Sequence, residues 1–184
     1  MSWWHAWTKW ISQPGCTVRL VTILDCGGHG LGDLRTVEIG FAAANDLPQL
    51  ADLLAELFEL ESDFHPQRDN QLRGLRMILA DPALGKLFVL RVDGKVAGMA
   101  NALITISTAE GGRVLLLEDV IVGKEYRGGG LGRRLVEHVM AWAREQGMTR
   151  ITLLADRDNQ TALDFYRKLG FVSSNMTVMR KPLS

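Results

Sequence analysis

The chain has 184 residues, of which 47% are hydrophobic, so it is long enough to bury one sizeable core and too short to suggest two domains. Its 21 lysines and arginines balance its 21 aspartates and glutamates, and this neutrality argues against nucleic acid or an acidic membrane as a partner. Cys16 and Cys26, the only cysteines, fit neither a disulfide framework nor a zinc site, and the sequence shows no apolar run of 18 residues and no secretory signal, so we expect a metal-free cytoplasmic protein.

Residues 1–35 form a leader that differs from the rest of the chain. Four tryptophans lie among its first ten residues. Trp3, Trp7 and Trp10 could share one face of a short helix that packs on the protein's own domain, on a membrane surface or in the groove of a partner. We therefore divide the chain into an N-terminal extension of unclear role, residues 1–35, and a functional domain, residues 36–184.

The functional domain is predicted to begin with one strand and two helices. Apolar and polar residues alternate over residues 36–42, as in a half-buried strand. Asn45 or Asp46 is then expected to cap an amphipathic helix with leucines at helical spacing. A second helix is predicted over residues 68–79 from its apolar residues at helical spacing. It is expected to end before Pro82, because proline disfavours helix at the residue that precedes it.

Three apolar, β-rich segments follow. Residues 86–92 and 95–106 are separated by Asp93-Gly94, a turn typical of a two-residue hairpin. After another glycine turn, residues 114–122 form a long apolar strand that only two acidic residues interrupt.

A strongly amphipathic helix is predicted over residues 130–146, followed by a strand over residues 150–155. Trp142 belongs to the apolar stripe of this helix, and we expect His138 on the opposite, solvated side.

The last elements are a helix capped by Asp158 or Asn159 and a strand over residues 176–180. The full order is then β-α-α-β-β-β-α-β-α-β. It predicts an α/β (α+β) domain with a mixed, mostly antiparallel central sheet flanked by helices.

A glycine-rich turn, Arg127-Gly-Gly-Gly-Leu-Gly132, precedes the helix over residues 130–146. Backbone N–H groups at a helix start lack intrahelical partners, and glycines let an anion approach them closely. The helix dipole and the side chains of Arg127 and Arg133 add positive charge. The turn therefore predicts a diphosphate site, and since the Walker lysine is absent, a nucleoside triphosphate is not expected.

Three segments together resemble one family: Leu117-Glu-Asp-Val-Ile-Val122, Tyr126-Arg-Gly-Gly-Gly-Leu-Gly132, and Asn159 with Phe165-Tyr-Arg-Lys-Leu-Gly-Phe171. The chain is similar, from about Val37 to Leu183, to the GNAT superfamily of N-acetyltransferases. In that family an Arg/Gln-x-x-Gly-x-Gly/Ala turn binds the pyrophosphate of acetyl-coenzyme A, and Arg127, Gly130 and Gly132 match its fixed positions. Only the leader departs from the family.

The resemblance implies a binding site for acetyl-coenzyme A as co-substrate. A bulge between two parallel strands would expose the backbone N–H groups of residues 120–122, and that of Val122 would polarise the thioester carbonyl. Asn159 would lie near the pantetheine and Tyr166 near the sulfur. The implied cofactor-binding residues are Val120, Ile121, Val122, Arg127, Gly128, Gly129, Gly130, Leu131, Gly132, Arg133, Asn159 and Tyr166.

Aminolysis of a thioester needs a neutral amine, stabilisation of negative charge on oxygen and a proton for the thiolate. Strand alternation predicts that Glu118 and Asp119 face opposite sides of the sheet, so at most one faces the amine. We favour Glu118 as the base, while either acid could instead pair with an arginine or orient the ammonium. Tyr166 could donate the proton or be an ordinary core aromatic residue.

The sequence thus predicts an acetyl-CoA-dependent N-acetyltransferase that moves the acetyl group to a primary amine by direct transfer in a ternary complex. Two alternatives remain: a non-catalytic acyl-CoA-binding sensor of the same fold, and a partner-binding role centred on the tryptophan-rich leader. A small-molecule or peptide amine is the expected acceptor, and its identity stays open because loops set such specificity. The resemblance also leaves a homodimer open.

Overall fold

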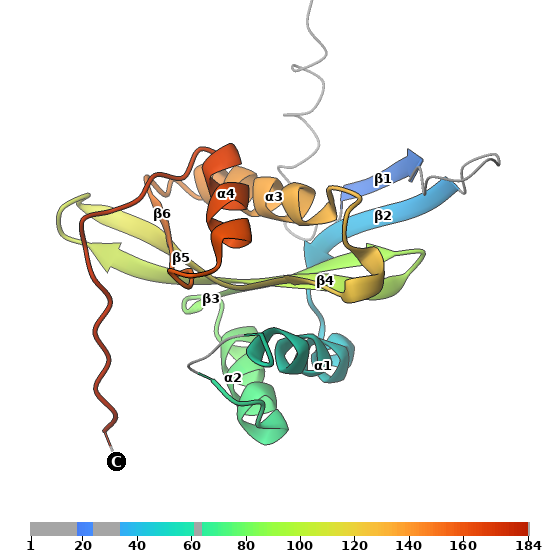
Figure 1. Ribbon diagram of the computed structural model, residues 1–184, viewed down its shortest axis with the longest axis horizontal. Helices are drawn as coiled ribbons and strands as arrows, with labels where there is room; N and C mark the ends of the chain where they lie inside the picture. The colour runs from blue at the N-terminus through green and yellow to red at the C-terminus, as the bar shows by residue number, and fades with distance from the viewer. Residues whose placement is uncertain (1–17, 24–33, 61–63, 184) are drawn as a thin grey trace, which may run out of the picture. The chain divides into compact units, whose positions relative to one another are not determined.

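The computed structural model describes residues 18–23, 34–60 and 64–183 (Figure 1). Over these residues the strands form one six-stranded sheet in the order β1-β2-β3-β4-β5-β6. Neighbouring strands are antiparallel, except that β5 and β6 are parallel. The strands are β1 (Val18–Ile23), β2 (Leu34–Phe41), β3 (Gly85–Val92), β4 (Lys95–Ser107), β5 (Gly112–Val122) and β6 (Ile151–Leu153).

The chain divides into two compact units, residues 1–154 and 155–184. In the first unit, helices α1 and α2 cover one face of the sheet and α3 covers the other (Figure 1). The second unit contains α4. None of the helices described is long and apolar enough to cross a membrane. The helices are η2 (Ala44–Asp46), α1 (Leu47–Phe58), α2 (Arg68–Ala80), η3 (Lys124–Tyr126), α3 (Leu131–Glu145) and α4 (Gln160–Lys168), where η denotes a 3₁₀ turn.

The predicted fold class is confirmed, because the sheet is mixed, mostly antiparallel and flanked by helices. The predicted order holds from β2 to α4, but the final strand over residues 176–180 does not form. Met176 and Met179 are exposed there, and β-forming residues make a strand only where a neighbouring strand completes the hydrogen-bond ladder. At the other end, β1 lies inside the range we expected to be an extension and pairs with β2 along its whole length.

The core on the α1 and α2 face follows from two periodicities. In α1, Leu50 and Leu54 lie four residues apart and are buried together against the sheet. In β3 and β4, Leu87, Val89 and Met99 alternate toward the same helices. On this face of the sheet, α1 therefore packs against both β4 and β5.

On the other face, α3 packs aromatic side chains against the sheet. The ring of Trp142 lies 5.4 Å from that of Phe88, and the ring of His138 lies 5.8 Å from the same phenylalanine. The expectation of a solvated His138 is therefore wrong, since residues four apart on a helix share a face and His138 lies four before Trp142. Burial lowers the pKa of the His138 imidazole.

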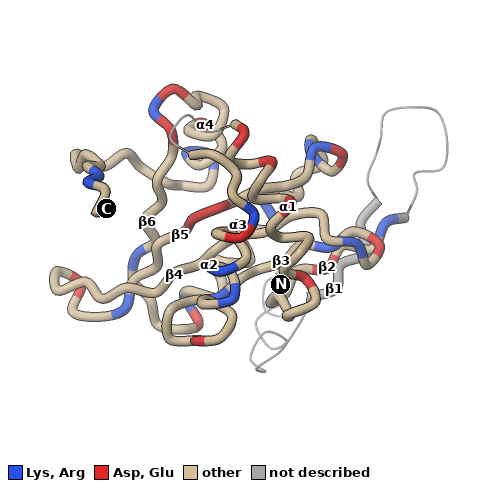
Figure 2. The backbone as a smooth tube through the Cα atoms, turned by 90° about the horizontal axis from the view of Figure 1, so that it is seen from below, with Lys and Arg blue, Asp and Glu red and all other residues tan. Residues whose placement is uncertain are grey.

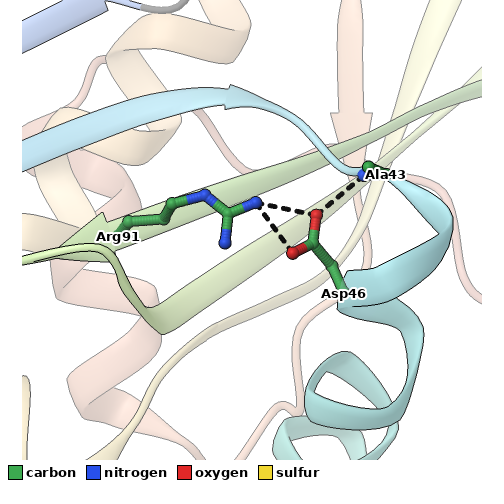
Figure 3. A network of polar contacts seen from close by, with 3 residues as sticks. All are labelled: Ala43, Asp46 and Arg91. Carbon is green, nitrogen blue, oxygen red and sulfur yellow. Dashed lines mark hydrogen bonds and ion pairs between the residues drawn. The ribbon is translucent and has the colours of Figure 1, made fainter.

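One buried ion pair attaches the start of α1 to β3 (Figure 3). Asp46 is 6% exposed, and both of its carboxylate oxygens lie 2.8 Å from Nη2 of Arg91. Asp46 occupies the N-cap position of α1 as predicted, but its side chain accepts a hydrogen bond from the N–H of Ala43, at 2.7 Å, rather than from the first turn of α1. The carboxylate therefore joins the helix to the sheet instead of capping it.

Candidate active site

The ladder between β4 and β5 contains a bulge. Met99 pairs with Ile121 and Asn101 pairs with Glu118, so two steps along β4 oppose three along β5. Within this interval Asp119 has φ +50°, in the left-handed region that residues other than glycine rarely adopt. An extra residue of this kind twists the strand and redirects its side chains.

The parallel strands β5 and β6 separate just before the bulge. Their pairing runs from Leu115 with Ile151 to Leu117 with Leu153, where β6 ends. Over the described part of the chain, residues 118–122 of β5 therefore have a strand on the β4 side only. This opening is where the sequence predicts that the N–H groups of Val120, Ile121 and Val122 meet a ligand, and that assignment stays a prediction.

The acidic pair lies at the bulge, in the stretch of β5 drawn red in Figure 2. Nδ2 of Asn101 donates a hydrogen bond of 3.2 Å to Oδ2 of Asp119, while Glu118 lies opposite Asn101 in the ladder. Both acids are therefore on the face of Asn101, and the expected alternation fails because the bulge adds a residue. Burial raises the pKa of the Asp119 carboxyl, and the hydrogen bond from Asn101 opposes this shift. A raised pKa suits a base that works near neutral pH, which makes Asp119 a candidate for the base beside the preferred Glu118.

The glycine-rich turn leaves open space at the start of α3. Gly128 and Gly130 have φ +87° and +73°, and a Cβ atom built on either would meet no described atom within 4 Å. Gly130 is the N-cap, no side chain of the described residues caps this helix, and the backbone N–H of Arg134 donates a hydrogen bond to the Gly130 carbonyl. Within the described part of the chain, the first N–H groups of α3 therefore have no acceptor, as is typical of helix starts that bind phosphates.

Both arginines expected to serve this turn are paired with carboxylates. Nη2 of Arg127 lies 2.6 Å from Oε1 of Glu56 in α1, and its Nε donates to the Val122 carbonyl at 2.7 Å. Nε of Arg133 lies 2.8 Å from Oε1 of Glu137, one turn along α3. The backbone N–H groups of the turn are therefore its main binding groups for an anion, because carboxylates partly neutralise the positive charges of Arg127 and Arg133.

Of the two predicted residues in the second unit, Tyr166 lies in α4 and Asn159 is the N-cap of this helix. Oδ1 of Asn159 accepts a hydrogen bond of 3.0 Å from the N–H of Ala162, which confirms that Asn159 caps this helix. The ring of Tyr166 lies 5.0 Å from that of Phe165 and 5.6 Å from that of Phe171. Burial raises the pKa of the Tyr166 phenol to about 12, so it is protonated at neutral pH.

Asn101 and Glu56 were not predicted as site residues from the sequence. Neither belongs to a motif, and each meets its partner through the fold, Asn101 across 18 residues and Glu56 across 71. Among the residues that the structure describes, no group of three histidine, cysteine or acidic side chains could hold a metal ion.

The chain is similar in sequence to known acetyltransferases. Residues 47–171 match the model of the Acetyltransferase (GNAT) family. The glucosamine 6-phosphate N-acetyltransferase of Trypanosoma brucei brucei is 34% identical over 87 residues, 47% of this chain and 57% of that protein. An uncharacterized N-acetyltransferase of Methanocaldococcus jannaschii is 32% identical over 139 residues, 75% of this chain and 62% of that protein.

The chain therefore spans about three fifths of these two relatives. Among solved structures, that of a possible acetyltransferase from Clostridium difficile 630 superposes with a TM-score of 0.74. The match covers 80% of this chain and 98% of that one at 22% identity, and it supports the fold.

Proposed function

Because the chain belongs to the GNAT family of acetyltransferases, we propose that it is an acetyl-CoA-dependent N-acetyltransferase. It moves the acetyl group to a primary amine by direct transfer in a ternary complex, with no covalent enzyme intermediate. The observation that carries this proposal is the open glycine turn, which directly follows the strand whose bulge and unpaired edge carry the acidic pair.

The donor side uses mainly backbone groups. The N–H groups of residues 128–133 hold the pyrophosphate. The glycines let it approach, because a side chain at Gly128 or Gly130 would occupy the space that the turn leaves open. The N–H groups of Val120 and Ile121 hold the pantetheine arm, and that of Val122 stabilises negative charge on the thioester oxygen. Acetyl-CoA supplies an acetyl group activated as a thioester.

On the acceptor side, we assign the proton transfer to the acidic pair. Asp119 takes the proton from the ammonium or from the attacking amine, directly or through a water molecule, because its burial favours the protonated carboxyl. Glu118, on the same face, then orients the ammonium. The resemblance supports two further roles: Tyr166 protonates the leaving thiolate, and Asn159 binds the pantetheine amide.

The acceptor is proposed to be a small-molecule or peptide amine. One relative is named for an amino-sugar phosphate, so glucosamine 6-phosphate belongs in the first panel of acceptors. The balanced charge argues against nucleic acid or an acidic membrane as a partner, and the two isolated cysteines, Cys16 and Cys26, suit a reducing compartment such as the cytoplasm. A homodimer is a separate proposal, for which sedimentation is the direct test.

The donor site is tested by titration calorimetry with acetyl-CoA and CoA. Gly128→Asp and Gly128→Asn form a matched pair, since both side chains tolerate positive φ and only the first adds a negative charge. We expect Gly128→Asp to weaken CoA binding at least about tenfold more than Gly128→Asn. Wild type that binds neither acetyl-CoA nor CoA would overturn the proposal.

Thiol release separates the enzyme from the sensor. With acetyl-CoA and a panel of amines, an enzyme releases CoA faster in the presence of at least one acceptor. A protein that binds CoA tightly while no amine accelerates release is instead the non-catalytic sensor.

A further inference from the structure

Asn101 is a polar residue in an apolar part of the sheet. It is 5% exposed and, with Asp46, makes up the buried polar and charged residues of the described chain. It lies opposite Leu87 of β3 and two residues after Met99, both of which belong to the core under α1 and α2. An amide in such surroundings needs hydrogen-bond partners.

The hydrogen bonds of Asn101 are incomplete. Nδ2 donates to Oδ2 of Asp119, whereas Oδ1 is buried and, within the described chain, has no donor. An unpaired buried acceptor disfavours folding, so an apolar side chain of similar volume would suit the core better. The contact with Asp119 is therefore the feature of the structure that accounts for an amide here.

Asp119 in turn depends on this contact. Its backbone is in the left-handed region at the bulge, and among the residues described the hydrogen bond from Asn101 is the one that holds its carboxylate. No residue of the described chain donates a hydrogen bond to Oδ1 of Asp119, so this oxygen keeps its capacity to accept a proton.

We infer that Asn101 is a positioning residue that holds Oδ2 of Asp119 and so presents Oδ1 of the same carboxylate to the proton of the amine. This inference rests on the proposed function. An N–H bond of the ammonium breaks, the O–H bond to Oδ1 forms, and the electron pair left on nitrogen forms a C–N bond with the thioester carbonyl carbon. The C–S bond then breaks, and CoA leaves as a thiolate that takes up a proton from the proposed acid, Tyr166. An amide donor suits both states of the carboxyl, because with the proton on Oδ1 the Oδ2 atom is still an acceptor for Nδ2.

The test uses the full chain, acetyl-CoA and whichever amine the wild type acetylates. Asn101→Leu removes the amide at similar volume, and Asn101→Thr keeps a hydroxyl donor. We expect Asn101→Leu to lower kcat about 10- to 100-fold and to leave KM for acetyl-CoA and CoA binding within about twofold. We also expect its melting temperature to be unchanged or higher, and Asn101→Thr to recover part of kcat.

A double-mutant cycle shows whether Asn101 acts through Asp119. If it does, Asn101→Leu with Asp119→Asn is no slower than Asp119→Asn alone. Asn175→Leu, the same change at an exposed position, serves as the control and should leave kcat and KM unchanged.

Two results would overturn the inference while the proposed function stands: an active wild type whose Asn101→Leu and Asn101→Thr variants keep kcat within about twofold, or losses that multiply in the double variant. If Asn101→Leu fails to bind CoA, kcat is measured in Asn101→Thr instead, alone and combined with Asp119→Asn. The same two results, an unchanged kcat or losses that multiply, then overturn the inference. A wild type that acetylates no amine overturns the proposed function and this inference with it.

Discussion

Individual residues at the bulge in β5 are held by neighbours from different parts of the chain. The backbone of Asp119 is set by the extra residue between Glu118 and Ile121, whereas its carboxylate is held by Asn101 of β4. Because one contact orients the side chain and burial raises its pKa, the position suits a group that must take up and release a proton.

Tyr166 is the residue on which the proposed proton donation can be tested most directly. Since burial raises its pKa to about 12, the phenol stays protonated over the working pH range, and its own ionisation should not limit activity there. We expect Tyr166→Phe to lower kcat about 10- to 100-fold with KM for acetyl-CoA nearly unchanged, measured by thiol release. Phe165→Leu is a control for ring packing, and an unchanged kcat in Tyr166→Phe would show that the hydroxyl is not the acid.

His138 should make stability depend on pH. Its folded-state pKa is lowered from 6.5, so the unfolded chain binds the proton more readily, and stability is present above that value and lost as the pH falls. We expect the melting temperature of wild type to fall between about pH 7 and pH 5, and that of His138→Leu to fall less. The same substitution at exposed His65 should leave the wild-type pH dependence intact, and equal slopes for all three proteins would contradict the prediction.

At the scale of elements, the turn before α3 is tied to α1 by the pair of Arg127 and Glu56. Half-exposed ion pairs contribute little to stability, so the main effect of Glu56 is its negative charge beside an anion site. We expect Glu56→Gln to tighten CoA binding about two- to fivefold at low salt, and less at high salt because ions screen the charge.

Titration calorimetry at two salt concentrations measures this effect. Glu145→Gln, at the far end of α3, is the matched control and should not change the affinity. Weaker binding in Glu56→Gln would instead mean that the ion pair orders the turn and that this order outweighs the charge.

At the scale of the whole molecule, a single buried ion pair joins the start of α1 to the sheet. Arg91→Met keeps the aliphatic part of the side chain but, within the described part of the chain, leaves the Asp46 carboxylate with the N–H of Ala43 as its one partner. We expect it to lower the free energy of unfolding by about 2 kcal/mol, less than for a fully buried pair because Arg91 is partly exposed. Urea denaturation measures the loss.

The exposed pair of Arg68 and Asp52, which joins α2 to α1, offers a comparison. Arg68→Met should cost less than about 1 kcal/mol, as is usual for surface ion pairs. Equal losses in the two variants would show that burial does not decide the strength of the Asp46 contact.

The sheet also extends further than the family resemblance suggested. β1 adds an antiparallel strand beside β2, so residues 18–23 belong to the sheet although they lie in the range assigned to the extension. Their sequence is a short apolar run, followed by glycines at positions 27, 28, 30 and 32 that are typical of a turn but do not identify which strand is the partner. A strand at an edge is defined by its neighbour, which local sequence does not specify.

From sequence alone, the helices, the strands β2 to β6 and the glycine turn could be predicted. These features follow from short-range patterns: leucines at helical spacing in α1, alternation in β2, Asp93-Gly94 in the hairpin and glycines where φ is positive. Such patterns express the periodicity and conformational freedom of neighbouring residues, which the chain carries before it folds. The same locality explains why the phosphate-binding turn was recognisable.

Only the tertiary structure decided how the acidic pair is presented. The bulge that brings Glu118 and Asp119 to one face depends on the register of β5 against β4, and the partners Asn101 and Glu56 arrive from elements distant in the chain. The absent strand at residues 176–180 has the same cause, since β propensity is realised only beside a partner. Register, burial and long-range pairing are properties of elements packed together, and no window of neighbouring residues contains them.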